Sequence, residues 1–334
     1  MSFKNIFFVS ITIVIGICLS LSTFAVPDAQ AKMITIKAIS AWPKSVFEVQ
    51  NFIKFIDMAQ ANVAQKYAGE LEIKYIGGPE VIPNREQVEA LRKGLVDVVF
   101  TTVGYYASII PEADAMNLTP MHPWEEREKG VNDFLNSVHQ KKANAYYLGR
   151  LGTEIPFTIH LNKSISSADL TGLKIRCSPT HIGFLKKLGA QPLVIPPPDV
   201  YTSLERGLAD GFIWPAGLIR DWGWQEVTKY IIQPSFYNAI NVVLVNLDAW
   251  NKLPKHLQEL LIETEKEAER YAVERGQTHI KNEFAALQKL GLQIVNLPPA
   301  EARKLTDAAY SSMWQVVLEK SPENGAKLKE LLNQ

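Results

Sequence analysis

The sequence predicts an α/β protein built from two domains. Strand-like and helix-like patterns alternate from residue 34 onward, which is typical of parallel or mixed sheets covered by helices. A short motif occurs twice, as Leu-Arg-Lys-Gly-Leu-Val-Asp at 91–97 and as Leu-Glu-Arg-Gly-Leu-Ala-Asp at 204–210. Without its leader the chain has about 300 residues, which is the length of two ordinary domains.

Residues 1–31 have the features of a secretory signal peptide. Lys4 precedes an apolar run over residues 6–21, and Ala29-Gln30-Ala31 is a cleavage site of small residues. A membrane anchor is the alternative, but an anchor needs about 20 apolar residues. We therefore expect cleavage after Ala31 and a product in the periplasm.

The composition argues against a nucleic-acid partner and against an intrachain disulfide. Lys plus Arg and Asp plus Glu both number 35, so the net charge is zero and no basic surface for nucleic acid is expected. One of the two cysteines leaves with the signal peptide, so Cys177 has no intrachain partner. The fold must therefore be held by packing, for which 47% hydrophobic residues suffice.

The first domain begins with a β-α-β pattern. Apolar alternation predicts a strand over 34–39, helical spacing predicts a helix over 47–67, and a second strand follows over 71–76. The first copy of the motif comes next, with Asn84 and Gln87 placed to cap its helix.

The middle of the chain is predicted from similar signals. Residues 111–142 are helical, with a helix start at His122-Pro123-Trp124. Strand patterns cover 145–151, 157–162, 172–177 and 192–195, a helix covers 181–188, and a strand over 242–246 returns to the first domain. Residues 254–290 form either one long helix that braces both domains or two helices broken near Gly276.

Each copy of the motif is expected to deliver residues to a ligand. A glycine closes the helix, an Asp follows, and a buried strand ends at Thr101 to Tyr106 in the first copy and at Trp214 to Gly217 in the second. Ligands of open α/β sheets bind beyond the carboxyl ends of the strands. The two sets of strand ends therefore predict a shared cleft.

Four stretches together resemble the periplasmic substrate-binding subunits of tripartite ATP-independent periplasmic (TRAP) transporters, the DctP-like family. They are residues 76–79 (Ile-Gly-Gly-Pro), 89–106, 170–176 (Leu-Thr-Gly-Leu-Lys-Ile-Arg) and 199–211. The resemblance implies a class II-like periplasmic binding protein with a cleft between two domains and a long helix bracing both. On this basis we expect domain I at 32–154 with 241–280, and domain II at 155–240 with 281–334.

The resemblance also implies a set of ligand-binding residues. The family's carboxylate-clamping arginine corresponds to Arg176, whose planar guanidinium matches a carboxylate. Trp214 corresponds to a pocket wall at the second strand end. The other positions that match cleft-lining residues are Trp42, Tyr105, Phe157, Phe236 and Asn238.

Departures from the family pattern narrow the ligand. Phe157 stands where sialic acid-binding relatives have an arginine, which argues against a sugar acid. Ile213 and Asn238 stand at the ligand positions of relatives that bind 2-oxo acids through a metal, so no metal or other cofactor is expected. One cation with several aromatic residues predicts a monocarboxylate with an apolar or aromatic body.

The resulting prediction is a receptor that performs no chemistry. It binds a small organic anion and delivers it to the membrane permease subunits of a TRAP transporter, as a monomer or weak dimer. Service to a sensor or an ATP-driven importer is one alternative. A secreted hydrolase is another, but Cys177 and His181 are separated by Pro179 and lack a third orienting group, and no zinc-binding spacing is present.

Overall fold

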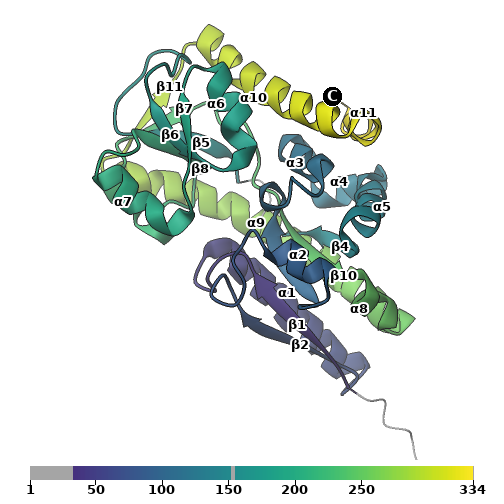
Figure 1. Ribbon diagram of the computed structural model, residues 1–334. Helices are drawn as coiled ribbons and strands as arrows, with labels where there is room; N and C mark the ends of the chain where they lie inside the picture. Colours follow the sequence, from purple (N-terminus) through teal and green to yellow (C-terminus); the bar gives the residue numbers. More distant parts are fainter. Residues whose placement is uncertain (1–32, 152–154, 334) are drawn as a thin grey trace, which may run out of the picture. The chain divides into compact units, whose positions relative to one another are not determined.

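The computed structural model describes residues 33–151 and 155–333, which contain two β-sheets with helices packed on them (Figure 1). The first sheet has the order β2-β1-β3-β10-β4. Its strands are β1 (Ile34–Ser40), β2 (Leu71–Gly77), β3 (Val98–Thr102), β4 (Ala145–Arg150) and β10 (Asn241–Asn246). Strand β10 runs antiparallel between β3 and β4, so the predicted return of the chain to the first sheet is confirmed.

The second sheet has the order β11-β9-β5-β8-β6-β7. Its strands are β5 (Phe157–Leu161), β6 (Lys174–Cys177), β7 (Gln191–Val194), β8 (Gly211–Pro215), β9 (Tyr230–Gln233) and β11 (Gln293–Asn296). Strands β6, β7 and β8 are parallel to one another, and β5 is antiparallel to β8. The mixed α/β fold predicted from the alternating patterns is thus confirmed.

The repeated motif forms the same structure in both sheets. Gly94 and Gly207 close the helices α2 (Gln87–Arg92) and α7 (Val200–Glu205) with φ angles of 71° and 70°, which favour glycine. The carboxylate of Asp97 accepts a hydrogen bond of 2.7 Å from the Lys37 backbone N–H. The carboxylate of Asp210 accepts one of 2.9 Å from the Lys174 backbone N–H. Each Asp therefore ties the strand that follows it to its parallel neighbour.

The remaining helices cover the faces and edges of the sheets. They are α1 (Phe47–Lys66), α3 (Pro111–Asp114), α4 (Pro123–Glu128), α5 (Val131–Ala143), α6 (Ile182–Lys187), α8 (Leu247–Lys252), α9 (Lys255–Lys289), α10 (Pro299–Lys320) and α11 (Pro322–Leu331). Short 3₁₀ turns include η1 (Val103–Tyr105), η2 (Ala115–Leu118), η3 (Pro179–His181) and η5 (Arg220–Trp222).

Helix α9 packs against β4 of the first sheet, and its C-terminal part packs in the core with residues of the second sheet (Figure 1). It is continuous over 35 residues, and Gly276 lies buried within it rather than breaking it. Near its start, Thr264 accepts a hydrogen bond from Asn62 of α1. Near its end, Leu287 packs in the core beside the second sheet, and His279 Nε2 lies 2.7 Å from the Gly217 carbonyl oxygen. The prediction of one bracing helix is confirmed over that of two helices.

One local prediction was wrong. The side chain of Gln87 does not cap α2; it donates hydrogen bonds to the Ser40 and Ile82 carbonyl oxygens, because the helix start is turned toward the end of β1. The helical prediction for residues 111–142 is confirmed, as short helices with extended backbone at Thr119 and His122. The start at Pro123 is confirmed, with His122 and Glu125 forming a capping box.

No helix among the described residues is both long enough and apolar enough to pass through a lipid bilayer. The predicted signal peptide lies outside the described residues.

A buried charge cluster joins α9 to the first sheet. Glu269 accepts two hydrogen bonds from Arg127, the shorter 2.7 Å. Glu265, one turn earlier in the helix, is fully buried and neither of its oxygens has a hydrogen-bond partner. Burial, reinforced by the negative charge of Glu269, raises the pKa of Glu265 well above its ordinary value. Glu265 is therefore held in its neutral form beside an ion pair.

These two glutamates are expected to respond oppositely to the same substitution. The raised folded-state pKa of Glu265 means that stability falls as pH rises above the unfolded pKa, so Glu265→Gln should raise the free energy of unfolding at about pH 8 and have less effect at about pH 5. Glu269→Gln should lower it by about 3 kcal/mol or more, because it breaks a buried ion pair. Urea unfolding of both variants at the two pH values measures this; a loss of stability in Glu265→Gln at the higher pH would contradict it.

Candidate functional site

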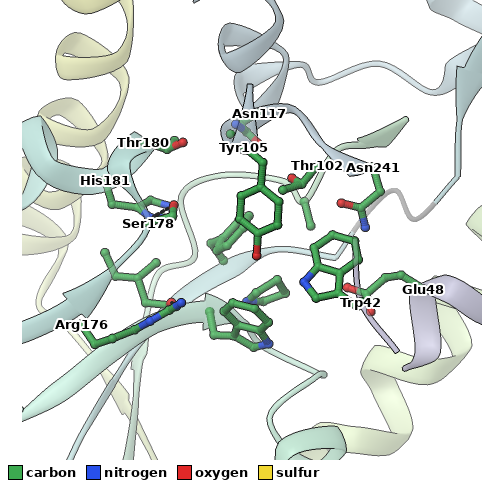
Figure 2. Close-up of a pocket in the computed structure, with 16 residues that line it drawn as sticks. Trp42, Glu48, Thr102, Tyr105, Asn117, Arg176, Ser178, Thr180, His181 and Asn241 are labelled. Carbon is green, nitrogen blue, oxygen red and sulfur yellow. Dashed lines mark hydrogen bonds between the residues drawn. The ribbon is translucent and has the colours of Figure 1, made fainter. Parts of the chain in front are cut away.

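A pocket lies where the two repeated strands end (Figure 2). The space between its lining atoms, open solvent included, is about 560 Å³. From the first-sheet side come residues at the ends of β1, β3 and β10, and from the second-sheet side residues at the ends of β5, β6 and β8. The lining residues are Trp42, Glu48, Thr102, Gly104, Tyr105, Asn117, Phe157, Arg176, Ser178, Thr180, His181, Ile213, Trp214, Pro215, Ala239 and Asn241.

Arg176 is a buried cation in this pocket. Its side chain is only 2% exposed, although it carries a full charge. Nε donates to the Ile195 carbonyl oxygen at 2.9 Å, and Nη1 lies 3.4 Å from the Ile213 carbonyl oxygen. Nη2 has no hydrogen-bond partner, and no carboxylate pairs with the guanidinium, among residues 33–151 and 155–333. Burial lowers the pKa of Arg176 to about 10, so the group remains charged at neutral pH.

Aromatic rings surround the guanidinium and the space before it. The Arg176 guanidinium carbon lies 5.1 Å from the centre of the Trp214 ring and 5.9 Å from that of Trp224, a favourable arrangement for a cation. On the other side of the pocket, the rings of Trp42 and Tyr105 lie 5.8 Å apart. The pocket thus combines one positive charge with flat apolar walls.

The residues beside Arg176 are uncharged. His181 is buried, and desolvation, helped by the charge of Arg176, lowers its pKa to about 3. Its Nδ1 lies 2.9 Å from the Ser178 hydroxyl. Cys177 is fully buried, and burial raises the pKa of its thiol to about 11. A thiol that keeps its proton, next to a histidine bonded to Ser178, does not form the nucleophile and base of a hydrolase.

Gly104 and Thr180 bring the two sides of the pocket into close contact. A Cβ atom on Gly104 would lie 2.5 Å from the Thr180 hydroxyl oxygen, so a larger residue does not fit there. The same hydroxyl donates a hydrogen bond of 3.0 Å to Asp114 at the end of α3. Asp114 also accepts from Asn117, and burial raises its pKa to about 7. A hydrogen bond therefore links a turn after β6 to a helix packed near the first sheet.

The pocket includes five of the seven residues predicted for the site: Arg176, Trp214, Trp42, Tyr105 and Phe157. The other two lie elsewhere. Phe236 is packed against Phe184 and Tyr237 in the core. Asn238 donates to the Thr119 carbonyl oxygen and pairs with Pro156 as an isolated bridge, which turns its amide away from the lining.

The chain matches the family of bacterial extracellular solute-binding proteins, family 7, over residues 45–320. It belongs to this family, the solute-binding component of TRAP transporters. As a family 7 solute-binding protein it is a receptor rather than an enzyme.

Two named proteins with related sequences have low identity to this chain but cover most of it. A solute-binding protein of Albidiferax ferrireducens is 21% identical over 331 residues, 96% of each chain. A monocarboxylate 2-oxoacid-binding periplasmic protein of Nostoc sp. is 26% identical over 246 residues, which are 70% of this chain and 64% of the relative.

Solved structures confirm the fold. An extracytoplasmic solute receptor of Bordetella pertussis binding pyroglutamic acid aligns with a TM-score of 0.79 and 19% identity, over 90% of this chain and 100% of the receptor. A TRAP solute-binding protein of Desulfovibrio salexigens with bound orotic acid aligns with a TM-score of 0.78 and 19% identity, over 90% and 97% of the two chains. The predicted two-domain solute-binding fold is therefore confirmed.

Several lining residues of this family 7 protein were missed by the sequence analysis. Glu48 is the most consequential, because it is a buried acid in the first turn of α1, a position usually read as a favourable contact with the helix dipole. Asn241, the first residue of β10, gave no signal beyond a strand start. No group of three or more potential metal-ligating side chains occurs in the part of the chain that the structure describes.

Substitution of Arg176 should separate binding from stability. Burial lowers its pKa to about 10 from an ordinary value above 12, which corresponds to a cost of roughly 3 kcal/mol in the unliganded folded state. Arg176→Met removes this cost and loses two hydrogen bonds to carbonyls, so Tm of the unliganded protein should stay unchanged or rise slightly.

Arg150→Met is the matched control for this measurement. Arg150 is equally buried but paired with Glu126 at 2.9 Å, so its loss should cost about 3–5 kcal/mol. A larger fall in Tm for Arg176→Met than for Arg150→Met, followed by calorimetry, would contradict the assignment of Arg176 as an uncompensated charge.

Proposed function

We propose that this protein is a periplasmic receptor that binds a small organic carboxylate and delivers it to a TRAP-type membrane permease. The observation that carries the proposal is Arg176, a buried guanidinium without an acidic partner among the described residues. A buried charge is costly unless it is paired, so the ligand supplies the missing anion. A carboxylate matches the geometry of the guanidinium and completes the hydrogen bonding of Nη2.

We further propose that the ligand is a monocarboxylate with an apolar or aromatic body. Trp42, Tyr105, Phe157 and Trp214 provide flat walls around the single cation. Relatives of this fold bind pyroglutamic acid and orotic acid, which are ring-bearing acids. Other relatives bind sugar-derived acids, L-galactonate and 2,3-diketo-L-gulonate. The apolar ring of Phe157 favours the first group.

The remaining parts of the proposal concern the whole protein. We propose export by the signal peptide, cleavage after Ala31, two domains with the predicted boundaries, and action as a monomer or weak dimer. Permease subunits are the proposed partners, and a sensor or an ATP-driven importer is the alternative. Two neighbouring genes for TRAP permease subunits favour the first partner; a neighbouring histidine kinase or ATPase favours the second.

Arg176 substitutions test the central proposal. Arg176→Ala should weaken carboxylate binding by roughly 100-fold or more, because it removes a charge-assisted bidentate contact, and Arg176→Lys should recover only part of the loss. Calorimetric titration is performed with monocarboxylates, dicarboxylates and sugar acids. Unchanged affinity in Arg176→Ala, or tight binding only of a sugar acid or dicarboxylate, would overturn the proposal.

Thr180→Val should test the hydrogen bond that crosses between the two sides of the pocket. Its loss is expected to weaken ligand binding by roughly 3- to 10-fold, because a single neutral hydrogen bond contributes about 0.5–1.5 kcal/mol. Stopped-flow tryptophan fluorescence measures dissociation, since Trp42 and Trp214 line the pocket. Thr264→Val, which removes a buried hydroxyl of α9 outside the pocket, serves as control; equal effects of the two variants would contradict the role of Thr180.

A further inference from the structure

Two buried N–H groups on the side of the pocket away from Arg176 lack an acceptor; Trp214 Nε1 and His181 Nε2, which lie beside Arg176, also have no hydrogen-bond partner. Trp42 is 5% exposed and Asn241 is 2% exposed, and both line the pocket. Neither Trp42 Nε1 nor Asn241 Nδ2 has a hydrogen-bond partner. Trp42 Nε1 faces the Tyr105 hydroxyl closely enough to affect its pKa, without completing a hydrogen bond. An unmatched buried donor costs about 1–3 kcal/mol, so two in one pocket point to an acceptor supplied by the ligand.

Glu48 is the third polar group at this end of the pocket. It lies in the first turn of α1, is 4% exposed and makes no salt bridge among the described residues. The ionisable groups around it come from different elements. Tyr105 belongs to η1, Asp221 to η5, and Arg275 and His279 to α9.

Glu48 is held in its neutral form by these surroundings. Burial raises its pKa to about 8, opposed by its own backbone N–H and reinforced by Asp221. Arg275 acts in the opposite direction, but its guanidinium is engaged by the Phe47 carbonyl oxygen and by Asn51 and Gln50. At neutral pH Glu48 is therefore mainly a carboxylic acid, which has a proton to donate.

The three groups lie away from Arg176. Figure 2 shows Trp42, Glu48 and Asn241 on one side of the pocket and Arg176 on the other, with Tyr105 between them. The pKa shifts agree with this arrangement. Both Arg176 and Glu48 affect the pKa of Tyr105, but Arg176 is not among the causes of the pKa shift of Glu48, nor Glu48 among those of Arg176. The pocket therefore has two polar ends separated by aromatic rings.

We propose that Trp42, Asn241 and Glu48 form a second recognition site, which binds an uncharged oxygen acceptor of the ligand at the end opposite its carboxylate. This inference rests on the proposed function, since it takes the carboxylate to be bound at Arg176. The ligand class is then a monocarboxylate with a carbonyl, lactam or hydroxyl oxygen on its far side. Each of the three groups offers a proton that such an oxygen can accept.

Two other ligand chemistries fit this end less well. An ammonium group would face two N–H donors and a carboxylic acid that must first ionise. A second carboxylate would bring two negative charges to a pocket with a single cation at Arg176. Each of these alternatives is an outcome of the experiment below.

Matched pairs of acids test the site on the mature protein. The pairs are 3-oxocyclopentanecarboxylate with cyclopentanecarboxylate, 4-oxopentanoate with pentanoate, and 4-acetylbenzoate with 4-ethylbenzoate. Each first member has a carbonyl where the second has a methylene or methyl-bearing carbon. The oxo member of at least one pair should bind roughly 10- to 100-fold more tightly, because it satisfies buried donors that its partner leaves unmatched. Proline, 4-(aminomethyl)benzoate and terephthalate represent the ammonium and dicarboxylate alternatives.

Five variants assign the effect to named groups. Trp42→Phe, Asn241→Leu and Glu48→Leu should each weaken binding of the oxo acid more than binding of its partner, and so reduce the preference for the oxo acid. Glu48→Gln keeps a donor and should retain most of the preference. Arg176→Ala should abolish binding of both members, which separates the two ends of the pocket.

The pH dependence provides an independent readout. In the wild type, affinity for the oxo acid should be constant at about pH 7 and fall roughly tenfold per unit above about pH 8, as Glu48 loses the proton it donates. Glu48→Gln should show no such fall below about pH 10, where Arg176 begins to titrate. Asp114→Asn is the control, because Asp114 titrates near pH 7 at the pocket edge and its removal should leave the fall above pH 8 intact.

The outcomes are distinguishable. Arg176-dependent binding of the plain acids without any advantage for the oxo members overturns this inference and leaves the proposed function standing. Preferred binding of an amino acid or a dicarboxylate overturns it in favour of that chemistry. A fall in affinity above pH 8 that persists in Glu48→Gln removes Glu48 from the site. Failure of all six acids to bind counts against both proposals.

Discussion

A cation buried without a counter-ion is the constraint on which this pocket depends. Arg176 keeps its charge although it is 2% exposed, because two backbone carbonyls and two tryptophan rings partly replace water. These contacts are dipolar and do not neutralise the charge, which leaves attraction for an anion in a setting of low dielectric. The empty receptor therefore carries an electrostatic cost that only its ligand removes. A ligand without a negative charge does not remove this cost, so the pocket favours anions over neutral molecules.

The repeated motif explains how such a pocket is positioned. Asp97 and Asp210 each fasten the start of a strand to the parallel neighbour, so β3 and β8 enter their sheets in the same way. The ends of both strands then reach the pocket, with Tyr105 just beyond β3 and Trp214 within β8. Helix α9 packs against both halves and limits their relative arrangement. The turn before each strand and the pairing of that strand are therefore sufficient to bring Tyr105 and Trp214 to the pocket.

Local signals in the sequence were sufficient to predict most of the fold. Of the charged and acidic groups in the pocket, Arg176 was predicted and Glu48 was not. Gly94 and Gly207 predicted turns with a positive φ angle, and both residues have one in the structure. Arg176 was found through the family resemblance, because a single arginine carries no signal of burial by itself. Glu48 was missed because its protonation is set mainly by burial, which depends on packing, with a smaller contribution from Asp221, a residue far along the chain. Phe236 and Asn238, predicted by the same resemblance, lie outside the lining of this pocket: Phe236 packs against Phe184, and Asn238 donates to the Thr119 carbonyl oxygen.

The protonation states of the pocket connect these features to the charge of the ligand. Its titratable lining groups are Glu48, Tyr105, Arg176 and His181. Burial raises the pKa of Glu48 and Tyr105 and lowers that of His181, so all three are mainly neutral near pH 7, and Arg176 alone is charged. The pocket thus presents one positive charge, which one carboxylate neutralises. A dianion would leave a buried negative charge uncompensated, whereas a neutral oxygen at the far end would satisfy Trp42 and Asn241 without adding charge. Desolvation therefore selects both the number of charges on the ligand and the end of the pocket at which its charge is bound.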